Sequence, residues 1–202
     1  MSNHKDVIIK RYNRISRIYD RMDKMVKEAW RIELLKQVSG EVLEVGVGTG
    51  VNLAYYPKGV SLTGVDFSPR MLELARKKVD RNQFRFEVQL LEADIQELPF
   101  QDHTFDYIVS TCVFCSVPDP VEGLKELKRV CKPSGKILML EHMRSENPVL
   151  GFGMDLFNPI SVSLWGANIN RRTMKNIEAS GLNVDSSELL MGTVMRKLTL
   201  SP

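Results

Sequence analysis

Hydrophobic positions along the chain follow two periods in turn, one typical of strands and one typical of helices. Short apolar segments alternate with helical segments and turns, an order that is typical of a mostly parallel sheet with crossover helices. The five strands expected from this pattern cover residues 41–46, 61–66, 84–91, 105–110 and 136–141.

Local signals mark where several helices begin or end. Ser68 can cap a helix and Pro69 suits its first turn, so a helix is expected from there. Residues 132–135, Lys-Pro-Ser-Gly, have the composition of a turn. Helical spacing also covers residues 52–56, 120–130 and 173–179, the last stopped at Gly181.

The C-terminal residues predict a hairpin, with segments 184–190 and 194–200 on either side of a turn at 191–193. Its antiparallel strands would close one edge of the sheet. The sequence therefore predicts an α/β fold with a seven-stranded, mostly parallel sheet, an antiparallel C-terminal hairpin and helices on both faces.

The N-terminal segment, residues 5–36, carries apolar residues at helical spacing, which predicts one or two amphipathic helices. In one interpretation its basic residues meet anionic headgroups while the apolar stripe covers a cleft. In the other they form an ordinary solvated face, because acidic residues lie among them. The basic residues are Lys10, Arg11, Arg14, Arg17, Arg21, Lys24, Lys27 and Arg31, and the acidic ones are Asp20, Asp23, Glu28 and Glu33.

Length and composition indicate the class of protein. The 202 residues suit a single domain, and 43% hydrophobic with 26% charged residues is ordinary for a globular protein. A net charge of +3 does not by itself indicate a nucleic-acid partner. The start lacks the apolar region of a secretion signal, and no apolar run suffices to span a bilayer. We therefore expect a cytoplasmic protein whose membrane contact, if any, is peripheral at the inner membrane surface.

The three cysteines provide no disulfide framework. Cys112 and Cys115 form a C-x-x-C pair of the kind used by zinc and redox sites, but no second pair and no thioredoxin-like flanks accompany it. We interpret both as small, semi-buried side chains and expect no metal site.

A glycine-rich segment follows the first expected strand and reads E-x-G-x-G-x-G from Glu44 to Gly50. Glycines let the chain turn sharply and bring backbone amides close to a ligand. The dinucleotide fingerprint would need glycine where Val51 stands, which argues against a nicotinamide cofactor. Asp66 ends the next strand, where a carboxylate can accept hydrogen bonds from both hydroxyls of a ribose.

These motifs, with Val65–Pro69, Ala93-Asp94, Leu98–Phe100 and Phe105-Asp106, resemble the class I S-adenosylmethionine-dependent methyltransferases of the type 11 group over about residues 40–142. The resemblance implies a Rossmann-like fold and S-adenosyl-L-methionine as cofactor. It implies that Asp66 binds the ribose, Phe67 lies beside the adenine, and Asp94 accepts from the adenine amine. The further cofactor residues it implies are Glu44, Gly46, Gly48, Gly50, Asn52, Ser68, Met71, Ile95, Thr111 and Cys112.

Other interpretations of these residues stay open, with Asp66 and Asp94 as helix-capping or loop carboxylates and Phe67 as a core residue.

The cofactor's methyl group is already electrophilic, so transfer mainly requires an aligned, dry acceptor. Positioning contributes on the order of 7 to 11 kcal/mol, more than a single general base. If a base acts, His142 is the candidate, because it follows the fifth strand and would face the cleft, although it could equally be structural.

The acceptor must be read from the rest of the chain. Residues 148–160 are apolar and broken by glycine and proline, which predicts an irregular, greasy lid. The Asn-Pro-Pro-Tyr motif of amino-nitrogen methylation is missing, and no cysteine follows a proline as a cytosine nucleophile would. Nucleic acid is therefore not the expected substrate.

Residues 12–20 resemble the opening helix of bacterial phospholipid N-methyltransferases and of ubiquinone/menaquinone C-methyltransferases. In the first family a tyrosine here closes over the cofactor, and Tyr19 is the matching position, with a catalytic role implied. Residues 141–142 and 165–173 are similar to animal thiol methyltransferases. The acceptor-binding residues inferred from that likeness are His142, Trp165, Asn168, Arg171 and Arg172, which a helix start with an exposed basic turn would equally explain.

The leading hypothesis is methyl transfer to a small lipophilic or membrane-presented acceptor, first the nitrogen of phosphatidylethanolamine, then a quinone precursor or an alkyl thiol. A non-catalytic, cofactor-binding regulatory module is the alternative from another class. Under the leading hypothesis, the expected partners of the protein are the lipophilic substrate and an anionic membrane surface. The whole chain is expected to be one methyltransferase domain, divided into N-terminal lid helices (1–37), cofactor-binding core (38–142), substrate lid (143–172), and C-terminal helix and hairpin (173–202).

Overall fold

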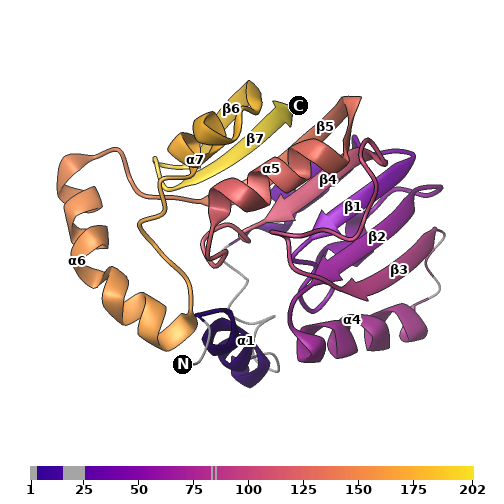
Figure 1. The fold of residues 1–202 in the computed structure, drawn as a ribbon, viewed down its shortest axis with the longest axis horizontal. Coiled ribbons are helices and arrows are strands. Elements are labelled where there is room, and N and C mark those ends of the chain that lie inside the picture. Colours follow the sequence, from indigo (N-terminus) through magenta and orange to yellow (C-terminus); the bar gives the residue numbers. More distant parts are fainter. Residues whose placement is uncertain (1–3, 16–25, 83, 85) are drawn as a thin grey trace.

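A seven-stranded sheet organises the computed structural model, which describes residues 4–15, 26–82, 84 and 86–202 (Figure 1). Its strand order is β3-β2-β1-β4-β5-β7-β6. The first five strands are parallel, and β7 runs antiparallel to both β5 and β6. The strands are β1 (Glu41–Val45), β2 (Ser61–Asp66), β3 (Glu87–Glu92), β4 (Phe105–Thr111), β5 (Cys131–His142), β6 (Asn183–Met191) and β7 (Met195–Ser201). The expected α/β fold class is confirmed.

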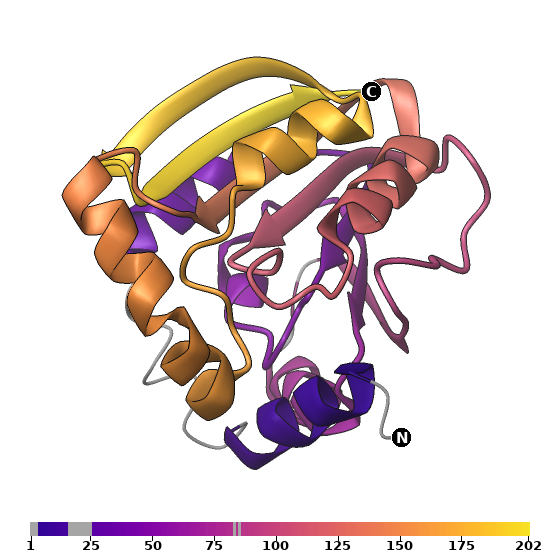
Figure 2. The same cartoon turned by 60° about the vertical axis from the view of Figure 1, so that its left-hand side comes forward.

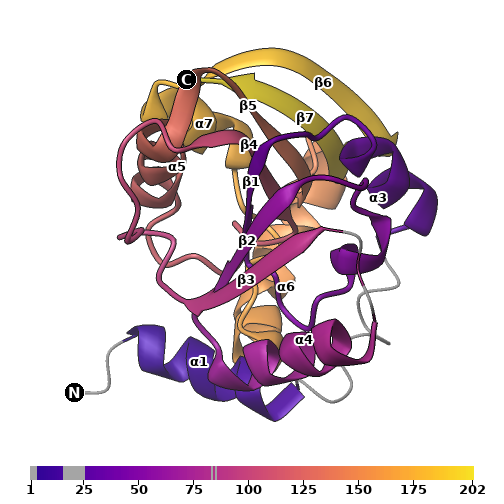
Figure 3. The same cartoon turned by 90° about the vertical axis from the view of Figure 1, so that its right-hand side faces the viewer.

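Helices cover both faces of this sheet (Figures 1 and 3). They are α1 (His4–Ile15), α3 (Glu28–Leu35), the short 3-10 helix η2 (Asn52–Tyr55), α4 (Pro69–Arg81), α5 (Pro120–Val130), α6 (Pro148–Trp165) and α7 (Thr173–Ser180). After β1, the chain adds β2 and β3 on one side of β1 and then adds β4 on the other side of β1. A crevice forms at the carboxyl ends of the strands where such an order reverses, so this edge is where a ligand is expected.

Alternation along β5 explains how the core is divided between the two faces. Ile137 and Met139 pack with the buried residues of α5 and α7, whereas Leu138 and Leu140 pack with those of α3. Successive strand residues point to opposite faces, so an unbroken apolar run implies cover on both sides. The central strand Val42–Val45 is fully buried for the same reason.

Capping residues fix where the helices begin. Ser68 Oγ accepts from the Met71 amide at 3.3 Å, and Pro69 stands in the first turn of α4. Asp119 caps α5 in the same way, followed by Pro120. Because these signals are local, the beginnings of both helices agree with the sequence-based expectation.

The expected turn at residues 132–135 lies inside β5 instead. Cys131 pairs with Phe105 and Lys136 pairs with Tyr107, so β5 adds three more residues than β4 over this stretch. Both flanks hydrogen-bond to β4, and the turn-forming residues are therefore accommodated as an irregularity within one strand. A Cβ on Gly135 would lie 2.8 Å from the Asp106 carbonyl oxygen, which explains glycine there.

The segment expected to be an irregular lid forms one uninterrupted helix, α6, despite Pro159 in its interior. Asn147 caps its start, and Gly166 ends it in the left-handed conformation with φ +79°. Together these caps outweigh the two internal glycines and the proline. Across the described residues, no helix combines the length and hydrophobicity needed to cross a membrane.

Candidate active site

The glycine-rich turn after β1 brings the backbone to the edge of the sheet. Gly46, Gly48 and Gly50 all have positive φ, which L-residues with a Cβ rarely adopt. The Gly48 amide donates to Asp66 Oδ2 at 2.9 Å, which fixes the turn against β2. Gly50 packs against Leu53 and Ala75, so its part is to shape the turn.

Three adjoining hollows meet at Gly46 and together form the groove of this site. Their walls come from the ends of β1, β2 and β4, the segment after β3, the 111–118 loop, and helices α1, α3, α4 and η2. The residues lining them are Ile8, Tyr12, Arg31, Glu44, Gly46, Val47, Gly48, Thr49, Val51, Asn52, Val65, Asp66, Phe67, Met71, Ala93, Asp94, Ile95, Thr111, Cys112, Val113, Ser116, Val117 and Pro118.

Asp66 stands at the centre of the groove, at the tip of β2. Its second oxygen, Oδ1, accepts from the Ser68 amide at 2.8 Å, and the side chain is only 8% exposed. Burial raises its pKa to about 6, although the amides of Ser68 and Gly48 act in the opposite direction. A carboxylate so held keeps lone pairs for hydroxyl donors of a ligand.

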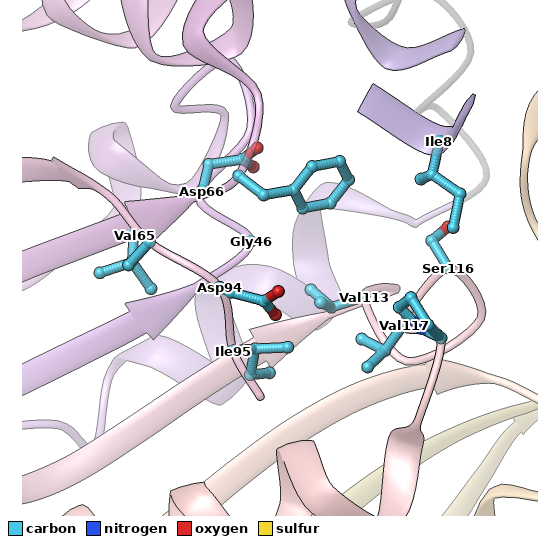
Figure 4. A pocket seen from close by; sticks show the side chains of 12 residues that line it. Ile8, Gly46, Val65, Asp66, Asp94, Ile95, Val113, Ser116 and Val117 are labelled. Atoms are coloured by element: carbon cyan, nitrogen blue, oxygen red, sulfur yellow. The ribbon is translucent and has the colours of Figure 1, made fainter. Parts of the chain in front are cut away.

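An apolar slot adjoins Asp66 (Figure 4). Asp94, after the end of β3, lies at one wall with Ile95, while Val113 and Val117 lie at the opposite wall. Asp94 Oδ1 accepts from the Gln96 amide at 3.0 Å. Apolar walls with one carboxylate at the rim suit a flat heterocycle that carries an amine.

Tyr12 of α1 closes the groove from the side of the N-terminus. Its ring meets Phe67 edge-on, with centroids 5.7 Å apart, and its hydroxyl hydrogen-bonds with Ser116 Oγ. Burial raises the pKa of the phenol, so it stays protonated. Tyr19, which the resemblance put in this role, lies outside the described residues.

The opposite end of the groove is polar. Glu44 Oε1 accepts from Asn52 Nδ2 at 2.7 Å, Glu44 Oε2 accepts from the Tyr56 hydroxyl at 3.0 Å, and Arg31 Nη1 donates to Asn52 Oδ1 at 2.5 Å. Burial raises the pKa of Glu44 to about 7. Arg31, Glu44 and Asn52 line this end with Thr111, whose Oγ1 accepts from Asn52 at 3.1 Å.

Replacing Arg31 with alanine should weaken cofactor binding about tenfold, because a charge-assisted hydrogen bond contributes about 1.5 to 3 kcal/mol. Arg31 is 4% exposed, and its guanidinium orients Asn52 at the polar end. Isothermal titration with S-adenosylmethionine measures the change, and the exposed Arg70→Ala serves as control. Equal affinity in both variants would contradict a role for Arg31.

Of three other expected cofactor residues, two line the groove and the third, Ser68, is buried and supports it. Met71 and Cys112 line the groove, and Cys112 has φ +54°, a strained conformation for a residue with a Cβ. Ser68 is 1% exposed and contributes through its cap of α4 and a hydrogen bond from its hydroxyl to Asn13 Oδ1 at 2.8 Å. The part of the chain that the structure describes contains no cluster of three metal-ligating side chains.

His142 is not among the residues that line the groove. It follows Leu140 on β5 by two positions and so shares the face that packs towards α3, and burial lowers its pKa. Because α3 also lines the polar end of the groove, the use of His142 as a base stays a prediction.

Glu141, the neighbour of His142 on β5, is a buried acid to which the sequence assigned no role of its own. Glu141 Oε1 accepts from Ser110 Oγ at 2.8 Å and from the Val113 amide at 3.1 Å, while Oε2 is buried and has no hydrogen-bond partner among the described residues. Glu141 thus anchors the loop that carries Val113 in the groove wall. Burial raises its pKa to about 7.

The raised pKa of Glu141 predicts a stability that depends on pH. Between its ordinary value of 4.5 and about 7, the folded chain holds a proton that the unfolded chain releases, so the free energy of unfolding falls as pH rises. Glu141→Gln should reduce this slope, to which Glu44 and Asp66 also contribute. Urea unfolding across this range tests it, with Glu122→Gln, exposed on α5, as control; unchanged slopes in Glu141→Gln would refute it.

Two of the expected acceptor-binding residues hold the 111–118 loop, which we call the groove's outer loop. Asn168 Nδ2 donates to the Cys115 carbonyl at 3.1 Å, and Arg171 Nη2 donates to the Val117 carbonyl at 2.8 Å. Arg172 is exposed at the start of α7, and Trp165 ends α6. Among the described side chains, Asn168, Arg171 and Arg172 are not part of the groove lining, so their direct contact with an acceptor, like that of Trp165, stays a prediction.

The residues present fit S-adenosylmethionine. Asp66 would accept from the ribose hydroxyls, the slot beside Asp94 would take the adenine, and the polar end with Glu44 and Arg31 would meet the ammonium and carboxylate of the methionine part. Opposite charges stand at that end, as a zwitterion requires. The fold and this groove define a class I, Rossmann-like methyltransferase.

Comparison with known proteins agrees. Residues 43–139 match the family model described as a methyltransferase domain. A phosphatidylethanolamine N-methyltransferase from Cereibacter sphaeroides is 37% identical over 148 residues, 71% of this chain and 72% of that protein. A demethylmenaquinone methyltransferase from Lactobacillus johnsonii is 31% identical over 175 residues, 79% of this chain and 71% of that protein.

Solved structures agree on the fold. A methyltransferase from Thermotoga maritima superposes with a TM-score of 0.69 at 22% identity, over 95% of this chain and 98% of that one. The chain belongs to the S-adenosylmethionine-dependent methyltransferases, and S-adenosylmethionine is its methyl donor.

Tyr12, Arg31, Tyr56, Ser116 and Glu141 contribute to the site or support it, and sequence reasoning assigned none of them a role there. Arg31 carried one usable signal, as a basic residue on the apolar, core-facing side of its helix. The other four become functional only through partners distant in the sequence.

Proposed function

We propose that this methyltransferase acts on a lipophilic acceptor presented at a membrane, and that the accepting atom is the nitrogen of phosphatidylethanolamine. We further propose that the protein works as a peripheral protein at the inner membrane surface. The observation that carries the proposal is the position of the exposed apolar helix α6 beside the groove's outer loop. The 37% identical relative, named for this activity, supports the choice of nitrogen.

The link between α6 and the groove runs through the segment that follows the helix. Asn158 Nδ2 in α6 donates to Asn168 Oδ1 at 3.1 Å, and Asn168 in turn holds the Cys115 carbonyl. The loop held in this way carries Ser116 and Val117 into the groove wall. An acceptor dissolved in an apolar phase against α6 would therefore approach the groove at this loop.

The bound cofactor supplies an electrophilic methyl group, and the chain's residues orient the reactants and exclude water. Hydrogen bonds within the protein hold the Asp66 and Glu44 carboxylates in place. Tyr12, whose ring packs against Phe67, covers the groove. Such positioning in a dry site accounts for a large part of the rate of group transfer. Methyl transfer by such positioning does not require His142 to act as a general base.

A quinone precursor is the second candidate, because the 31% identical relative is named a demethylmenaquinone methyltransferase and such an acceptor is also lipophilic. One assay separates the two. The purified protein is incubated with S-adenosylmethionine and vesicles that contain both phosphatidylethanolamine and demethylmenaquinone, and the lipids are analysed by mass spectrometry. N-methylated phosphatidylethanolamine is expected.

The other outcomes of this assay each have a definite meaning. Methylation of the quinone alone would replace the first candidate by the second. Tight cofactor binding without methylation of either lipid, or of an added alkyl thiol, would favour a regulatory module.

A further inference from the structure

Helix α6 exposes an unusual number of large apolar side chains. On an ideal helix they fall within an arc of about 160°, so they form one face. We call this set the α6 face. Its members, with their exposed fractions, are Val149 (83%), Leu150 (53%), Phe152 (67%), Leu156 (63%), Phe157 (58%), Ile160 (55%) and Leu164 (53%).

The opposite side of α6 packs on the protein and leaves the α6 face outward. Met154 is 8% exposed, and a Cβ on Gly151 would lie 2.5 Å from Arg144 Nη1. Ser161 Oγ donates to the Ala167 carbonyl at 2.9 Å. The helix therefore has a fixed orientation. It lies at one edge of the molecule (Figure 2), and its apolar residues are exposed there.

The acids at the N-terminal end and middle of α6 are paired with arginines, Glu146 with Arg196 and Asp155 with Arg144, and the C-terminal end is bordered by basic residues. Asp155 is the one acid in the helix, and Arg144 Nη2 binds it at 2.8 Å. At the C-terminal end of α6, Arg11 Nη1 donates to the Val162 carbonyl at 2.5 Å and Arg14 Nη2 to the Leu164 carbonyl at 3.4 Å. The exposed Lys10 lies on the same helix, α1.

We propose that the α6 face docks on the surface of an anionic phospholipid bilayer, with its apolar side chains at the acyl boundary and the basic residues of α1 at the headgroups. An apolar helix face bordered by lysine and arginine is what such an interface binds. The inference rests on the proposed function, which puts the acceptor in a membrane, and it assigns the contact to α6 rather than to α1 alone.

This docking places the groove's outer loop at the membrane. Asn168, directly after the helix, holds the loop by two hydrogen bonds to the Cys115 carbonyl, from its amide at 2.8 Å and its side chain at 3.1 Å. A bilayer bound along the α6 face therefore lies next to the side of the groove through which a lipid headgroup would enter.

The test uses the full-length double variant Phe152→Ser with Leu156→Ser. The control, Ile32→Ser with Val184→Ser, removes two apolar side chains of comparable exposure, 46% and 43%, elsewhere on the molecule. Sedimentation with phosphatidylcholine vesicles containing phosphatidylglycerol should show a loss of binding of about tenfold or more in the α6 variant, and little change in the control. Cofactor binding and thermal unfolding confirm that both variants are folded.

Two outcomes would overturn the proposal. If the α6 variant binds these vesicles as tightly as the parent chain, the α6 face is not the docking surface. A parent chain that sediments as a dimer without lipid, and becomes a monomer in the α6 variant, identifies a second copy as the occupant instead.

Activity towards dispersed short-chain phosphatidylethanolamine separates this inference from the proposed function. The α6 variant should methylate that dispersed lipid as the parent does, and lose activity only on vesicles. If the parent binds vesicles through α6 but methylates no phosphatidylethanolamine in either form, the docking surface stands and the proposed acceptor fails.

Discussion

Replacing Asp66 with alanine is expected to lower the affinity for S-adenosylmethionine about a hundredfold or more. Asp66 is a buried carboxylate in the groove, and two hydrogen bonds to ribose hydroxyls would contribute about 1.5 kcal/mol or more each. A change of about 1.4 kcal/mol is tenfold in affinity. Isothermal titration with the cofactor and with S-adenosylhomocysteine measures this loss.

The pH dependence gives the same prediction a second readout. Burial raises the pKa of Asp66 to about 6, so protonation removes acceptor capacity as pH falls through that value, and cofactor affinity should fall with it. Asp66→Asn should bind weakly without this step. Asp80→Ala, exposed on α4, is the control. Parent-like affinity in Asp66→Ala would contradict the assignment of the whole groove.

Substituting Gly46 with alanine should damage both folding and cofactor binding. Gly46 has φ +63°, a conformation that costs an L-residue about 1 to 2 kcal/mol. Its added Cβ would also lie 2.5 Å from Val113 Cγ2, so the neighbouring Val113 side chain in the groove wall must shift. A loss of about tenfold or more in cofactor affinity is expected, with a lower unfolding temperature.

Gly59 offers a matched control for this substitution. It has φ +81°, yet a Cβ there meets no atom of the described residues within 4 Å, so Gly59→Ala carries only the backbone cost. It should lower the unfolding temperature slightly and leave cofactor affinity unchanged. Adding Val113→Ala to Gly46→Ala should restore part of the lost affinity. Equal effects of the two glycine substitutions would show that the contact with Val113 is unimportant.

The outcome for the helices shows what local signals can predict. The starts of α4 and α5 follow from Ser68-Pro69 and Asp119-Pro120, because a capping side chain and a proline act within one turn. The course of α6 was predicted wrongly, because its apolar, glycine-containing sequence reads as a broken lid. Its packing against Arg144 and its caps at both ends keep it helical.

The groove shows the same division. Gly46, Gly48 and Asp66 could be assigned from the sequence, because a strand followed by a glycine turn places them at one edge of a parallel sheet. Tyr12 could not, because its hydroxyl meets Ser116, which is 104 positions away in the sequence. The hydrophobic pattern gives the face of a helix and leaves open which of its residues reaches the site.

By itself, the sequence determined the α/β architecture, the order of its elements, the glycine turn and the carboxylate at the tip of β2. All of these depend on neighbours along the chain or on the period of apolar residues. The tertiary structure decided that Arg31 and Tyr12 complete the groove, that Glu141 anchors the loop carrying Val113, and that α6 turns its apolar side outward. Those outcomes depend on packing between distant segments, which no local pattern encodes.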